Sequence, residues 1–124
     1  MKYLRFWFPV FIYSGIIFYA SSVPSVKSPG IVHFDKLLHV CEYMPFGFLL
    51  TRALSLSFEN VSMRVICGFA VFLAVLYALS DEFHQIFVVG RDASLYDVLA
   101  DSLGIVLGCW VFYQLNLKIK KGMG

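Results

Sequence analysis

Ionisable residues gather in two short stretches of an otherwise apolar chain. In the first, Asp35, His39 and Glu42 stand at i, i+4 and i+7, which places them on one face of a helix. The second stretch is SDEFHQIFVVGRDASLYDVLADSLG, residues 80–104, and it holds Asp81, Glu82, His84, Gln85, Arg91, Asp92, Asp97 and Asp101. Histidine and carboxylate side chains transfer protons, and arginine binds carboxylates and phosphates through its planar fork. These stretches are the candidates for a site.

Catalysis, binding and packing are all compatible with these residue types. In a catalytic site, His39 would be the general base, Asp35 would orient it, and Asp81 or Glu82 would be the acid. In a binding site, Arg91 would contact an anionic headgroup. In the packing interpretation, the same side chains only hydrogen-bond across helices, at about 0.6 kcal/mol per pair. No nucleophile–base pair stands out, so the sequence leaves the three interpretations open.

A metal site is a less favoured interpretation. Imidazole and carboxylate ligands for zinc or a harder divalent ion are available from His39, Glu42, Asp81, Glu82 and His84. The chain lacks an HExxH pattern or a comparable spacing, and these ligands would have to converge from two helices. We therefore predict neither a metal site nor a cofactor.

The composition indicates a membrane protein. Of the 124 residues, 60% are hydrophobic and 15% are charged, whereas soluble domains have about 45–50% apolar and about 25% charged residues. A domain of this length cannot bury so much apolar surface, so lipid must cover the rest. The net charge of +2 is small and its cations are scattered, so a nucleic-acid partner is not expected.

The apolar segments predict an all-α membrane protein, a four-transmembrane-helix bundle that forms one domain over residues 1–124. The helices are expected at about 4–22, 36–56, 63–87 and 97–117. Each charge-free core is shorter than the ~20 residues that a bilayer requires, so the spans must include their polar ends. The first segment also has features of a secretory signal peptide, but the other three segments are equally membranous, and we interpret it as a helix.

The lysines and arginines predict the orientation. Seven flank one side of the predicted bundle and three flank the other, so both termini are expected in the cytoplasm. Both polar stretches then lie at the outer face, where stripes from three helices can meet.

Three local patterns in the last segments predict structure. Gly90 is expected in a turn, and Ser94 followed by Asp97 has the spacing of a capping box at a helix start. Gly104 and Gly108 continue the face of Asp97 and Asp101, and such small-residue pairs let another helix approach closely. That helix could belong to this chain or to a partner protein.

Together, DKLLHVCEYMPFGFLL, the 80–104 stretch and SSVPS after the first segment resemble the VanZ-like family of small bacterial membrane proteins. The resemblance implies a four-helix protein of the bacterial inner membrane, associated with resistance to the glycopeptide antibiotic teicoplanin. It also implies a functional polar pattern, which falls here on Asp35, Lys36, His39, Tyr43, Asp81, Glu82, Gln85, Arg91 and Asp97. At position 101 many relatives have Asn where this chain has Asp101.

Together these observations predict an outward-facing polar pocket. The resemblance to the VanZ-like family implies that this pocket binds, or acts on, a lipid-linked or peptidoglycan-precursor component of the cell envelope. Lys36, Tyr43, Gln85, Arg91, Asp97 and Asp101 are the candidate binding residues, and Asp35, His39, Asp81 and Glu82 are the candidate catalytic residues. The alternative is a non-enzymatic accessory protein that associates with a partner through Gly104 and Gly108.

Overall fold

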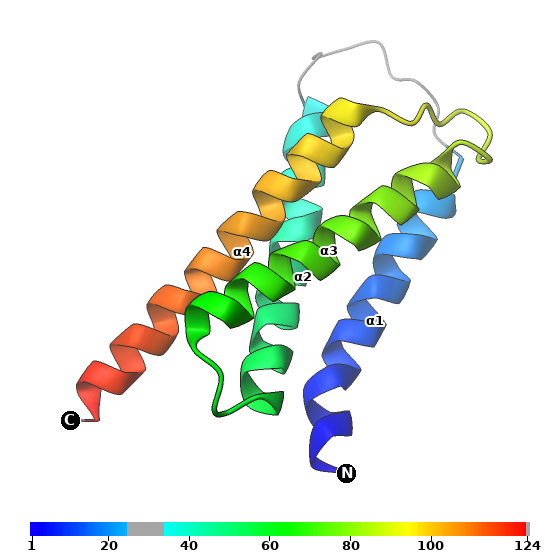
Figure 1. Cartoon of the computed structure of the whole chain (residues 1–124). Coiled ribbons are helices and arrows are strands. Elements are labelled where there is room, and N and C mark those ends of the chain that lie inside the picture. The colour runs from blue at the N-terminus through cyan, green and yellow to red at the C-terminus, as the bar shows by residue number, and fades with distance from the viewer. Residues whose placement is uncertain (25–33, 124) are drawn as a thin grey trace.

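The computed structural model describes residues 1–24 and 34–123, and within these ranges helices are joined by turns and loops, without strands. Its four helices are α1 (Lys2–Ser22), α2 (Phe34–Ser57), α3 (Met63–Gln85) and α4 (Leu95–Gly122). Both termini lie at the same end of the bundle (Figure 1). The all-α architecture is confirmed. Most of the loop expected between the first two helices, residues 25–33, lies outside the described residues.

The helix boundaries follow the prediction closely except at the end of α4, which continues to Gly122 instead of ending near residue 117. Hydropathy could not detect these last residues because they are polar. Lys120 and Lys121 lie in the last turn, where cations interact favourably with the partial negative charge of a helix C-terminus. The predicted turn at Gly90 is confirmed, and its φ of 79° is a conformation that glycine adopts without strain.

α1, α3 and α4 are long and apolar enough to cross a membrane. Their outward surfaces carry large apolar side chains, among them Phe11, Ile16, Phe72 and Leu76, as expected for helices that face lipid. α2 is equally long but carries more polar residues, and it packs against all three other helices. Its polar side chains are therefore directed toward protein more than toward lipid.

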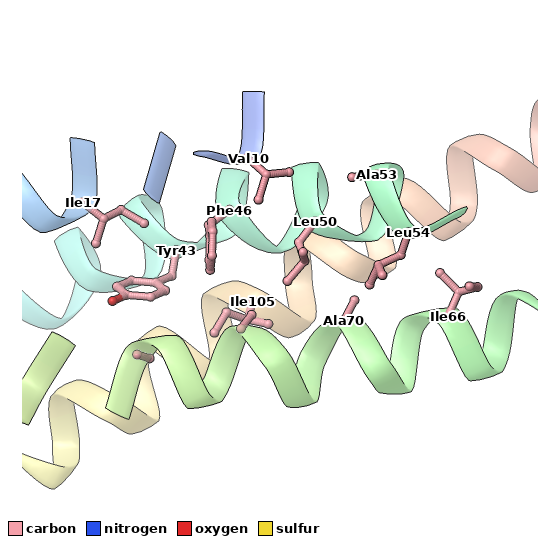
Figure 2. Close-up of a cluster of buried hydrophobic side chains, with 12 residues drawn as sticks. Val10, Ile17, Tyr43, Phe46, Leu50, Ala53, Leu54, Ile66, Ala70 and Ile105 are labelled. Atoms are coloured by element: carbon pink, nitrogen blue, oxygen red, sulfur yellow. The ribbon is translucent and has the colours of Figure 1, made fainter. Parts of the chain in front are cut away.

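The apolar core is built around α2. Tyr43, Phe46 and Leu50 of α2 lie between Ile17 of α1 and Ile105 of α4, and all five are buried (Figure 2). α3 contributes a stripe of small residues to the same core, namely Ala70, Ala74 and Ala78. Because these alanines are small, α3 can lie close to α2 and α4 beneath the polar end.

Glycines bring the backbones of α2 and α4 into direct contact. A Cβ added to Gly104 would lie 2.4 Å from the carbonyl oxygen of Val40, and one added to Gly108 would lie 2.0 Å from that of Met44. A Cβ added to Gly47 of α2 would likewise lie 2.4 Å from the carbonyl oxygen of Ile105 in α4. Gly104 and Gly108 are buried against α2 of the same chain, so the surface expected to serve a partner protein is already occupied within the bundle.

Candidate functional site

Polar side chains from four helices and one loop converge at the end of the bundle away from the termini. We call this set the polar cluster. Its members are Ser21 of α1, Asp35, Lys36, His39, Glu42 and Tyr43 of α2, Asp81, Glu82 and Gln85 of α3, Arg91 of the following loop, and Asp97 and Asp101 of α4. Every candidate catalytic and binding residue predicted from the sequence belongs to it, whereas His84, considered as a metal ligand, does not. The helical spacing of each stripe produced this convergence once α2 packed against α3 and α4.

The contact between α2 and α4 contains paired charges. His39 Nδ1 lies 2.8 Å from Asp101 Oδ1, and His39 Nε2 lies 3.7 Å from Asp97 Oδ1. Lys36 Nζ donates to both Asp97 and Asp35. The orienting contact to His39 that was expected from Asp35 is thus made by Asp101. Asp35 remains at the rim, with its side chain 60% exposed.

The contact between α2 and α3 is centred on Asp81. Tyr43 donates its hydroxyl proton to Asp81 Oδ2 over 3.2 Å, and Gln85 Nε2 donates to the same oxygen over 3.5 Å. All three residues are buried. The second carboxylate oxygen of Asp81, Oδ1, accepts neither of these hydrogen bonds.

Glu82 joins α3 to the start of α4. The backbone N–H of Ser94 donates to Glu82 Oε2 over 3.0 Å, and the Ser94 hydroxyl accepts from the N–H of Tyr96. Ser94 is therefore the N-cap, as expected, but the capping box predicted with Asp97 is not formed. The carboxylate that accepts from the Ser94 N–H is instead that of Glu82 in α3, and the carboxylate of Asp97 pairs with Lys36.

Arg91 binds the C-terminal end of α1. Its Nη2 donates to the carbonyl oxygen of Ala20 over 2.9 Å, and its Nε donates to that of Val23 over 3.2 Å. These carbonyls belong to the end of a helix, where a cation is favourable. The guanidinium carries five N–H groups, so donors remain for a ligand beside this structural role.

A cavity of about 320 Å³ opens among these residues. The residues that line it are Ala20, Ser21, Asp35, Leu38, His39, Glu42, Asp81, Gln85 and Arg91. Three of them are acids and one is a permanent cation, so the wall is predominantly acidic. It suits a ligand that donates hydrogen bonds, such as a hydroxyl, amide or ammonium group, with an anionic group placed near Arg91.

Four buried side-chain oxygens lack a hydrogen-bond partner within the part of the chain that the structure describes: Ser21 Oγ, Asp81 Oδ1, Glu82 Oε1 and Asp101 Oδ2. Such atoms are rare because an unpartnered buried polar group costs about 1–3 kcal/mol. All four belong to the polar cluster. Their concentration at one place makes the polar cluster the candidate functional site.

The structure places one residue differently from the prediction and adds one residue that the prediction missed. His84 shares a face with Asp81 in sequence, but its Nε2 lies 3.0 Å from Ser22 Oγ and its ring stacks on Phe18 of α1. Ser21 lines the cavity, and sequence reasoning missed it because it appeared only as part of a serine- and proline-rich loop. Its proximity to Arg91 depends on the packing of α1 and could not be read from spacing.

A comparison with family models matches residues 4–117 to the VanZ/LLP1 family. The chain belongs to this family. The match spans α1, α2, α3 and most of α4, so it includes every member of the polar cluster. The resemblance to VanZ-like proteins that the motifs indicated is therefore confirmed. No curated protein and no solved structure gives a significant match to the chain.

Proposed function

We propose that this VanZ/LLP1 protein binds, in its polar cavity, the headgroup of a lipid-linked component of the cell envelope. The observation that carries the proposal is the pair of unpartnered oxygens, Ser21 Oγ and Asp81 Oδ1, on residues that line the cavity. A ligand that donates hydrogen bonds to both would remove their desolvation cost. In the bacterial inner membrane, with both termini cytoplasmic, this cavity opens at the outer face.

The size and surroundings of the cavity favour an amphiphile. About 320 Å³ is at the lower end of the volumes of small-molecule sites, which suits one sugar or amino-acid unit. The helices around the cavity expose apolar side chains that can pack against a lipid tail. Arg91, at the wall, suits a phosphate between headgroup and tail. Peptidoglycan precursors combine these features, and binding them is a route by which the chain would contribute to glycopeptide resistance.

Acid–base chemistry at the bound headgroup is an extension of the proposal. His39 lines the cavity and is oriented by Asp101, and a histidine held by a carboxylate is suited to transfer a proton. Asp81, with one oxygen engaged by Tyr43 and one unpartnered, would be the neighbouring acid or the ligand acceptor.

The experiment measures lipid retention by the purified protein in detergent. The probes are a polyprenyl diphosphate carrying an amino sugar and the same lipid without the sugar, both followed by native mass spectrometry. We expect the sugar-bearing lipid to be retained, and Asp81→Asn to reduce its affinity at least tenfold. Asn keeps an acceptor for Tyr43, so the fold is preserved. Glu59→Gln, in the loop at the opposite end of the bundle, is the matched control and should bind normally.

The same variants give a cellular readout. In a strain without the native copy, teicoplanin susceptibility is compared at equal protein abundance. Increased susceptibility for Asp81→Asn but not for Glu59→Gln would support the proposal. Equal lipid retention by wild type and Asp81→Asn would contradict it.

The accessory-protein alternative is favoured by one specific observation. Arg91 and Glu82 both bind backbone groups that join helices, which is what a purely structural cluster would do. In that case Asp81→Asn would leave lipid retention and susceptibility unchanged and alter only the free energy of unfolding.

A further inference from the structure

His39, Glu82 and Asp101 form a compact group deep in the polar cluster, on the side of the cavity where α2, α3 and α4 meet. Each residue comes from a different helix, and each offers one ligand-type atom such that the three atoms lie within 4.8 Å of one another. Ligands about 2.1 Å from a tetrahedral ion lie about 3.4 Å apart. Side-chain adjustments of about 1 Å would therefore bring all three atoms to coordination distance.

Both carboxylates of this group have an oxygen that the protein does not satisfy. Asp101 is 0% exposed and Glu82 is 5% exposed. Asp101 Oδ2 and Glu82 Oε1 have no hydrogen-bond partner among the described residues, although the other oxygen of each is bonded, to His39 and to Ser94. A buried carboxylate usually satisfies both oxygens, so each of these is available to a ligand that the chain does not supply.

The charge around the group is also unbalanced. The polar cluster contains six carboxyl groups, on Asp35, Glu42, Asp81, Glu82, Asp97 and Asp101, but only two permanent cations, on Lys36 and Arg91. Lys36 is engaged with Asp35 at the rim and with buried Asp97, and Arg91 binds the end of α1. Neither donates to Glu82 or Asp101 among the bonds that the structure contains. Buried carboxylates are normally paired or coordinate a metal.

We propose that His39, Glu82 and Asp101 bind one divalent transition-metal ion, Zn²⁺ or Mn²⁺. One imidazole nitrogen and two carboxylate oxygens are a donor set intermediate between the nitrogen- and sulfur-rich sites of softer ions and the all-oxygen sites of Mg²⁺ and Ca²⁺. Two carboxylates and a divalent ion are neutral together, which reduces the negative charge excess of the cluster without removing all of it. This site was not predicted from the sequence. Its ligand Asp101 lies on a different helix from His39, and spacing along the chain does not show that the two residues are close.

The surrounding contacts would hold the ligands in place. The N–H of Ser94 fixes Glu82 through Oε2, and Asp97 lies 3.7 Å from His39 Nε2. Metal ligands in proteins are commonly oriented by such neighbouring hydrogen bonds and charges. The metal site and the headgroup cavity share His39 but rest on different unpartnered oxygens, and the metal can be tested without any lipid.

The test uses the full chain purified in detergent, freed of metal with a chelator, and titrated with Mn²⁺ alone. The signal of free Mn²⁺ in electron paramagnetic resonance reports binding, and Zn²⁺ is added as a competitor. We expect one Mn²⁺ per chain, displaced by Zn²⁺, and an affinity lower by at least tenfold in Asp101→Asn. His84→Gln is the matched control, since His84 lies near this end of the bundle but contacts Ser22, and it should bind as wild type does.

A second measurement does not depend on any acidic variant. Electron spin echo modulation of the bound Mn²⁺ should show one imidazole nitrogen in the wild type and in His84→Gln, and none in His39→Gln. Absence of saturable Mn²⁺ binding by the wild type overturns the proposal. Bound Mn²⁺ without imidazole modulation, or affinity unchanged in Asp101→Asn, overturns it as well.

Discussion

A methyl group on Gly104 would collide with the backbone of α2. In Gly104→Ala the new Cβ would lie 2.4 Å from the carbonyl oxygen of Val40, and ordinary contact begins at 3.4 Å, so α2 must retreat by about 1.0 Å. Overpacking of this kind costs about 1–3 kcal/mol. Val40 follows His39 directly, so the same shift would lengthen the 2.8 Å contact between His39 and Asp101 beyond hydrogen-bond distance.

The loss of that contact adds to the cost. A hydrogen bond that involves a charged group contributes about 1.5–3 kcal/mol, whereas replacing a helical glycine by alanine regains about 1 kcal/mol. We therefore expect Gly104→Ala to lower the free energy of unfolding by about 1.5–5 kcal/mol. The Gly68→Ala control has the opposite sign, because a Cβ at Gly68 meets nothing within 4 Å. It should gain about 0.5–1 kcal/mol.

Unfolding in detergent can be followed by the reaction of a thiol-specific dye with Cys109, which is buried beside the glycine contact. The exposed thiol of Cys41 and the partly exposed thiol of Cys67 are first replaced by serine in all proteins compared. We expect Gly104→Ala to expose Cys109 at a lower temperature than the parent, and Gly68→Ala at the same or a higher one. If Gly104→Ala is as stable as Gly68→Ala, then α2 and α4 do not touch at this glycine, and the reasoning is refuted.

Three further predictions address other contacts and the orientation. Arg91→Lys should destabilise the protein by about 1–2 kcal/mol, because an ammonium cannot reproduce the two-nitrogen contact with the end of α1; an unchanged unfolding temperature would contradict this. Tyr43→Phe should cost about 1–3 kcal/mol in the same assay, since it leaves buried Asp81 with only the longer of its two hydrogen bonds. A cysteine placed at Val89 should react with a membrane-impermeant maleimide in intact cells, whereas one at Lys118 should react only after permeabilisation. The reverse pattern would invert the predicted orientation.

Several features could be predicted from the sequence because they depend on neighbours along the chain. Hydropathy located four helices, of which α1, α3 and α4 are long and apolar enough to cross a membrane. The 3.6-residue period placed Asp35, His39 and Glu42 on one face, and Asp97 and Asp101 on another. Motifs on those faces identified the family, which the match over residues 4–117 confirms.

Tertiary packing alone decided how those faces combine. Gly104 and Gly108 pack on α2 within the chain, and only this close approach gives His39 its partner Asp101 in place of nearby Asp35. The rotation of α3 directs His84 toward α1 and Glu82 toward the N-cap of α4. Periodicity fixes which residues share a helix face, but the partner of that face depends on side-chain volume and backbone approach between segments distant in sequence. The group formed by His39, Glu82 and Asp101 and the polar cavity both arise from this packing between distant segments.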